Sequence, residues 1–81
     1  MIRVAVIGPG RVGTALALAL PRPAYAVTAV AGRGQKALDA FTARLPGAEV
    51  RPLARVAADA DLVLVCVPDD AVAQVVRAVA N

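Results

Sequence analysis

A turn containing three glycines places the strongest constraint on how this chain folds. It lies within the sequence VAVIGPGRVGTALALAL at residues 4–20, where Gly8, Gly10 and Gly13 match the pattern G-x-G-x-x-G. The preceding residues 2–7 are mostly apolar and rich in β-branched side chains without alternation, which is typical of a parallel strand buried on both faces. An apolar segment ending in prolines follows the glycines and predicts a helix. A strand, a tight turn and a helix therefore follow one another directly.

The rest of the chain alternates strand-like and helix-like segments. The runs AVTAVA and LVLVCV have the composition of buried strands, and apolar side chains recur at helical spacing in the segments that follow them. We expect strands at residues 2–7, 26–31, 48–51 and 62–67, helices at 11–20, 35–45 and 71–80, and a short helix or turn at 53–58. This alternation predicts one α/β domain over residues 1–81, with a Rossmann-type parallel sheet in the order 3-2-1-4 and helices on both faces.

Composition limits the other functions open to the chain. It has 81 residues, 59% of them hydrophobic and 2% aromatic, and a net charge of +3 from scattered arginines, which argues against nucleic-acid binding. With one cysteine and no histidine it has no internal disulfide and no ordinary metal site. We expect Cys66 to be a small buried side chain and Tyr25 to serve in packing. No apolar run approaches the roughly 18 residues of a membrane span, so we expect a cytoplasmic protein without a membrane partner.

The glycine string has three possible interpretations. Arg11, the run TALALAL and an A-x-A site at residues 24–26 could form a leader peptide, but the segment MIRVAVIG would then be unexplained. The string could also be a turn that binds no ligand. The strand before it and the helix after it favour a third interpretation, a binding site for the pyrophosphate of a dinucleotide in which Pro9 stiffens the loop.

A dinucleotide site would assign each residue of the turn a physical role. Gly8 permits the tight turn out of the strand, Gly10 allows the pyrophosphate to approach the backbone, and Gly13 lets the helix lie close to the strand. The backbone N–H groups of Arg11 and Val12, at the positive end of the helix dipole, would face the phosphates.

The residues after the second expected strand favour NADP over NAD. An NAD site usually places a carboxylate about 20 residues beyond the glycines, where it holds the ribose 2′-hydroxyl, whereas this chain has Ala31, Gly32 and Arg33 there. Arg33 could pair with a 2′-phosphate and stack on the adenine, Gly32 would leave room for the phosphate, and Lys36 could assist. The alternative is that Arg33 is a solvated loop residue.

The segments IGPGRVGTALA, VAGR and DADLVLVCVPDDAV resemble those of NADP-binding oxidoreductases. That group includes pyrroline-5-carboxylate reductase, ketopantoate reductase and the F420-dependent NADP reductases. The chain resembles most a set of poorly characterised Rossmann-like proteins that carry a helical C-terminal domain. The resemblance implies that Val67, Pro68 and Asp69 line the nicotinamide side of the site. Alternatively, Asp69 and Asp70 cap the last helix.

The resemblance further implies a hydride-transferring oxidoreductase that binds NADP(H) and acts on a small molecule whose identity the sequence does not give. In the relatives a second domain completes the substrate site and usually a homodimer, whereas this chain ends at Asn81. We therefore expect a truncated N-terminal domain that is inactive alone, with completion by partner chains as the alternative. Two other functions stay open, a nucleotide-sensing module without turnover and a scaffold that pairs through an exposed sheet edge.

Overall fold

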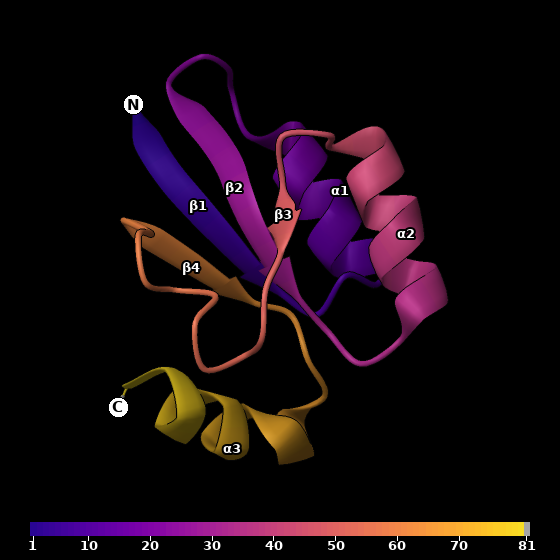
Figure 1. The fold of residues 1–81 in the computed structure, drawn as a ribbon, viewed down its shortest axis with the longest axis vertical. Coiled ribbons are helices and arrows are strands. Elements are labelled where there is room, and N and C mark those ends of the chain that lie inside the picture. The colour runs from indigo at the N-terminus through magenta and orange to yellow at the C-terminus, as the bar shows by residue number, and fades with distance from the viewer. Residues whose placement is uncertain (81) are drawn as a thin grey trace.

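The computed structural model describes residues 1–80, except for the side chains of Asp69 and Ala80. Strands and helices alternate along most of the chain (Figure 1). In chain order the elements are β1 (Ile2–Ile7), α1 (Arg11–Ala19), β2 (Tyr25–Ala31), α2 (Gln35–Arg44), β3 (Glu49–Val50), β4 (Leu62–Val65) and α3 (Asp69–Ala80). All the expected strands and the three main helices are present, with small shifts at their ends.

For residues 53–58, between β3 and β4, the sequence predicted either a short helix or a turn. The segment forms consecutive hydrogen-bonded turns and no helix: Arg55 N donates to Pro52 O at 2.9 Å, and Ala58 N donates to Arg55 O at 3.1 Å. The segment still contributes to the core, because the side chain of Val56 within it is fully buried. Leu53, Ala57 and Ala60 pack against the same core cluster at helical spacing from Val56, but the hydrogen bonds join residues three apart, so the segment stays a run of turns.

The four strands form one parallel sheet in the order β3-β2-β1-β4. The predicted sheet order is therefore confirmed. The central strand β1 pairs with β2 on one side and with β4 on the other, and its residues Val4 to Ile7 are almost entirely buried. Continuous burial explains why this strand is apolar without alternation.

Helices cover both faces of the sheet, as the sequence predicted (Figure 1). One core cluster joins α1 and α2 to one face, and its buried members are Val4, Val6, Ala17, Val30, Leu38, Phe41, Leu45 and Ala48. A second cluster joins α3 and the turn segment to the other face, and its buried members are Ala5, Ile7, Ala29, Ala31, Val56 and Val75. Tyr25 packs against the edge of the first cluster, as expected.

The two outer strands of the sheet, β3 and β4, both carry exposed apolar side chains, and Val50 on β3 is 46% exposed. β4 borders β1 alone, and both Leu62 and Val65 on it are more than a third exposed. It is therefore an edge strand, as the sequence analysis anticipated. Within residues 1–80, no helix is long and apolar enough to cross a membrane.

Candidate functional site

A cavity of about 530 Å³ lies where the carboxyl ends of the strands meet. In open parallel sheets this edge, beside the strands where the order reverses, is where ligands bind. The cavity, called the crevice below, is lined by the glycine turn, by the residues that follow β2, β3 and β4, and by the start of α3. Its lining residues are Ile7, Gly8, Pro9, Gly10, Ala31, Gly32, Arg33, Arg51, Pro52, Leu53, Cys66, Val67, Pro68, Asp70, Ala71 and Val75.

Two glycines of the turn are required by the fold itself. Gly8 has a φ of +96°, and a side-chain carbon there would collide with the carbonyl oxygen of Cys66 at the end of β4. A side-chain carbon at Gly13 would collide with the carbonyl oxygen of Gly8 and press on Val6. These two positions let the turn and α1 lie close to the sheet, as the spacing of the motif predicted.

Gly10 differs from both. Its backbone is extended, with φ −75° and ψ −166°, and a side-chain carbon built on it would meet no atom within 4 Å. Neither backbone conformation nor packing within the described residues requires a glycine there. Gly10 instead leaves open space at the wall of the crevice, directly before the first turn of α1.

The N-terminus of α1 has unused hydrogen-bond donors. Thr14 N makes the first helical bond, to Gly10 O at 2.9 Å, so the amides of Arg11, Val12 and Gly13 precede that bond. No side chain caps this end, and its first turn contains no acidic residue. Thr14 Oγ1 also donates to Pro9 O at 3.3 Å, which ties the turn to the helix. Such a helix start is suited to an anion.

The predicted site residues that follow β2 line two different cavities. Gly32 and Arg33 line the crevice. The space beside Gly32 is filled by the ring of Pro9, which a side chain at position 32 would strike. Gly32 therefore admits Pro9, whereas the sequence analysis had assigned it to making room for a phosphate. Lys36 lines a neighbouring groove of about 780 Å³ between α1 and α2, together with Arg11.

The residues after β4 are only partly described. Val67 and Pro68, which the resemblance assigns to the nicotinamide side, line the crevice, and the side chain of Asp69 lies outside the described residues. Capping of α3 was the alternative role given to Asp70, which lines the crevice and whose side chain makes no hydrogen bond to a helix N–H among the residues that the structure describes. Pro68 O accepts a hydrogen bond from Ala71 N at 2.9 Å, so the backbone closes the first turn of α3.

The sequence analysis did not select two side chains that line the crevice. Arg51 directly follows β3, and Cys66 directly follows β4. Cys66 is only partly buried, in contrast to the fully buried side chain expected, and its partial burial raises the pKa of the thiol. The rule that residues following parallel strands gather at one edge of the sheet could have identified both positions.

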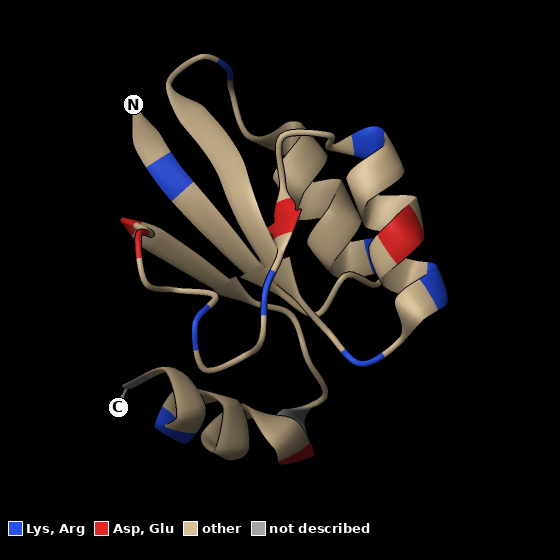
Figure 2. Cartoon of the chain, in the orientation of Figure 1, with Lys and Arg blue, Asp and Glu red and all other residues tan. Residues whose placement is uncertain are grey.

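Basic and acidic residues are scattered along the described part of the chain, on strands, helices and loops (Figure 2). A basic segment occupies the loop between β2 and α2, which contains Arg33, and no basic stripe runs across the sheet. The part of the chain that the structure describes contains no group of three or more His, Cys, Asp or Glu side chains that could hold a metal ion. Most of the residues that line the crevice are apolar, and a few are polar or charged, as is usual for small-molecule sites.

Comparison with solved structures identifies the same architecture in a dehydrogenase. The chain superposes with a TM-score of 0.80 and 27% sequence identity on the crystal structure of a protein from Sinorhizobium meliloti 1021 assigned as a myo-inositol dehydrogenase. The match covers 96% of this chain and 24% of that one, so this chain spans about a quarter of the dehydrogenase. No match was found among curated proteins.

The comparisons identify the fold of this chain and the family to which it belongs. The shared architecture is the Rossmann-like fold, which in other proteins binds nucleotide cofactors at the carboxyl ends of the strands. The resemblance to pyrroline-5-carboxylate, ketopantoate and F420-dependent reductases is supported only at the level of a Rossmann-like domain whose fold matches that of a dehydrogenase. The Rossmann-like domain family matches residues 1–81, the whole of the sequence, and the chain therefore belongs to the Rossmann-like domain family.

Proposed function

We propose that this chain binds NADP(H) and serves as the cofactor domain of a hydride-transferring oxidoreductase. The open space at Gly10 is the observation that carries the proposal. Gly8 and Gly13 are explained by contacts within the chain, but nothing within 4 Å explains Gly10. A glycine that the fold does not need, placed before an uncapped helix, is suited to close approach of a phosphate to the backbone.

Each part of the crevice has a role in this proposal. The amides at the start of α1 bind the pyrophosphate, and the helix dipole favours its charge. Val67 and Pro68, on the β4 side, border the nicotinamide. When bound, the cofactor supplies the hydride, while the chain binds and orients it. The substrate is a small molecule. Other parts of the full-length protein complete its binding site, and those parts also form a homodimer.

The preference for NADP rests on Arg33. It is exposed on the wall of the crevice directly after Gly32, at the end of β2. Of the described side chains that line the crevice, Asp70 is the one carboxylate, and it belongs to α3 rather than to the β2 end. Arg33 therefore meets a 2′-phosphate without a competing carboxylate on the β2 loop.

Calorimetric titration with NADPH and with NADH at one fixed salt concentration tests the proposal. NADPH should bind clearly more tightly. Arg33→Ala should weaken NADPH binding by roughly 1.5–3 kcal/mol, the range for a hydrogen bond to a charged group, and leave NADH binding little changed. Equal losses for both dinucleotides would show that Arg33 does not bind the 2′-phosphate.

A second variant tests the role of Gly10. Gly10→Val should abolish binding of both dinucleotides and change the free energy of unfolding only modestly, because the added side chain meets open space in the protein alone. Gly47→Val is the matched control, since Gly47 is exposed, a side-chain carbon there meets nothing closer than Val27 O at 3.9 Å, and it does not line the crevice. Unchanged affinity in Gly10→Val would contradict the proposed phosphate site.

A further inference from the structure

Arg51 is the second arginine of the crevice. Its side chain is 24% exposed and lines the cavity together with Arg33. Its backbone N–H donates to Val30 O at 3.0 Å, so it lies beside the last residues of β2. The two arginines therefore come from adjacent strand ends, on the side of the crevice where the adenosine half of a dinucleotide would lie.

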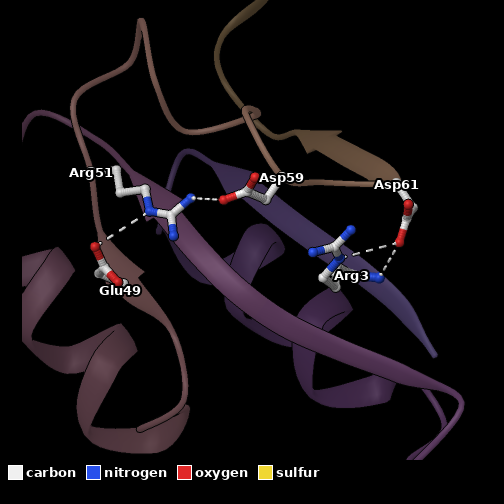
Figure 3. Close-up of polar contacts among 5 residues, drawn as sticks. All are labelled: Arg3, Glu49, Arg51, Asp59 and Asp61. Atoms are coloured by element: carbon white, nitrogen blue, oxygen red, sulfur yellow. Dashed lines mark hydrogen bonds and ion pairs between the residues drawn. The ribbon is translucent and has the colours of Figure 1, made fainter.

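Two carboxylates from different segments hold the guanidinium of Arg51 (Figure 3). Arg51 Nε donates to Glu49 Oε1 at 3.4 Å, and Nη1 lies 3.7 Å from Asp59 Oδ2. One residue is on β3, and the other belongs to the segment before β4. These contacts restrict the orientation of the guanidinium plane and surround one positive charge with two negative charges.

The surroundings of Arg33 are different. Arg33 is exposed and has no ion-pair partner among the side chains that the structure describes. A 2′-phosphate is therefore attracted to Arg33, whereas the cluster of Arg51, Glu49 and Asp59 carries a formal charge of −1 and offers it no net attraction.

Arg51 retains a flat surface that can bind an aromatic ring. Guanidinium groups stack on aromatic faces, and the next residues, Pro52 and Leu53, add apolar surface to the same wall. The protein supplies no aromatic side chain for this purpose. Phe41 is fully buried in the core, and Tyr25 lies at the opposite end of β2.

We propose that Arg51 is the base-binding residue of this crevice, with its guanidinium stacked on the adenine and its plane oriented by Glu49 and Asp59. This inference rests on the proposed function. It assigns the adenine to Arg51, so Arg33 binds only the 2′-phosphate. Because NADPH and NADH carry the same adenine, Arg51 contributes equally to both and sets affinity without setting the preference between them.

The test compares Arg51→Met and Arg51→Lys with the unchanged chain in titrations with NADPH and NADH. Arg51→Met should weaken both by roughly five- to tenfold, the range for a partly desolvated cation–π contact, and keep their ratio constant. Arg51→Lys should recover at most part of the lost affinity, because an ammonium group keeps the charge but has no flat surface to stack on the adenine. Arg55→Met is the matched control, since Arg55 is exposed on the same turn segment and does not line the crevice.

Each other outcome overturns the inference. A loss confined to NADPH would make Arg51 a phosphate ligand, and full affinity in Arg51→Lys would show that charge alone is needed. Unchanged affinity in Arg51→Met, while the unchanged chain binds both dinucleotides, would overturn this inference and leave the proposed function intact. Failure of the unchanged chain to bind either dinucleotide would overturn both. Thermal unfolding of each variant separates loss of binding from loss of the fold.

Discussion

Gly8 and Gly10 are two positions apart in the same turn, and their surroundings differ. Gly8 adopts a φ of +96°, its N–H donates to Ala31 O at 2.9 Å, and it lies against the carbonyl of Cys66. The turn therefore connects the ends of three strands through the backbone at Gly8. Gly10 has an extended backbone and open space beside it. At the scale of single residues, one glycine serves the fold and the other is available to a ligand.

This difference predicts opposite effects of alanine at the two positions. Gly8→Ala should lower the free energy of unfolding by about 2–4 kcal/mol, because it adds positive-φ strain and a backbone collision. Gly10→Ala should change it by less than about 0.5 kcal/mol, because a small loss of helix capping offsets the lower entropy of the unfolded chain. Urea unfolding of both variants measures these values. A large loss in Gly10→Ala would mean that the fold also needs that glycine.

Cys66 offers a residue-scale test of the crevice, because it is the single cysteine of the chain. Burial raises the pKa of its thiol, so the rate of reaction with iodoacetamide should rise toward its plateau at a higher pH in the folded protein than in urea. At pH 8 the folded protein should therefore react more slowly than the unfolded chain. Because the thiol pKa is higher in the folded protein than the ordinary value of 9.0, Cys66 contributes to the free energy of unfolding below pH 9.0. This stabilisation is lost as the pH rises through the pKa of the thiol in the folded protein.

NADPH should slow the reaction of Cys66 with iodoacetamide further, and a rate unaffected by NADPH would place the ligand away from Cys66.

The elements on the two faces of the sheet are attached in different ways. On one face, α1 approaches β1 closely through Gly13 and Ala17, both buried, while α2 inserts Phe41 into the core. On the other face, a run of turns and α3 take the place of a helix pair, with Val56 and Val75 as their buried anchors. The helices position the crevice, because Gly10, directly before α1, and the first residues of α3 both line it.

Phe41 is the largest of the fully buried side chains, and its loss should affect the attachment of α2 more than any change on the helix surface. Phe41→Ala should lower the free energy of unfolding by about 3–5 kcal/mol through lost burial and a cavity. Ala43→Gly, at an exposed position of the same helix, should lower it by about 1 kcal/mol through helix propensity alone. Urea unfolding measures both values, with Phe41→Leu as a milder variant. Equal losses would mean that packing of α2 contributes little.

At the scale of the whole molecule, the crevice lies where four strand ends, two helix starts and the turn segment meet. The chain is short, with 81 residues, and a domain of this size has a small margin of stability. A ligand that contacts all of these elements stabilises the native arrangement in proportion to its occupancy, since it has no comparable site on the unfolded chain.

NADPH should therefore raise the thermal unfolding midpoint of the chain. At about 100 times its Kd, the stabilisation is about 2.7 kcal/mol, and for a domain of this size that corresponds to roughly 10–20 °C in Tm. Differential scanning calorimetry across a concentration series measures the shift, and Gly10→Val should show none. An unchanged Tm at concentrations that saturate the calorimetric titration would contradict binding to the native fold.

Much of the architecture followed from local patterns. Short apolar runs, prolines and glycines predicted the strands and the three main helices, and the alternation of these elements predicted the sheet order 3-2-1-4, which is confirmed. The segment at 53–58 could not be assigned, because its apolar residues have helical spacing over too short a run to decide between a helix and the turns that the structure shows. The strand expected at 62–67 ends at Val65, close to the turn that begins α3.

The sequence by itself determined the order of the elements and the presence of a glycine turn between β1 and α1, because these depend on neighbours along the chain. Only the tertiary structure decided what each residue meets across the sheet. It placed Pro9 against Gly32, left Gly10 open, and held Arg51 between Glu49 and Asp59 beside the end of β2. The physical reason is that these contacts join strand ends distant in the sequence, and neither spacing nor periodicity specifies such pairs.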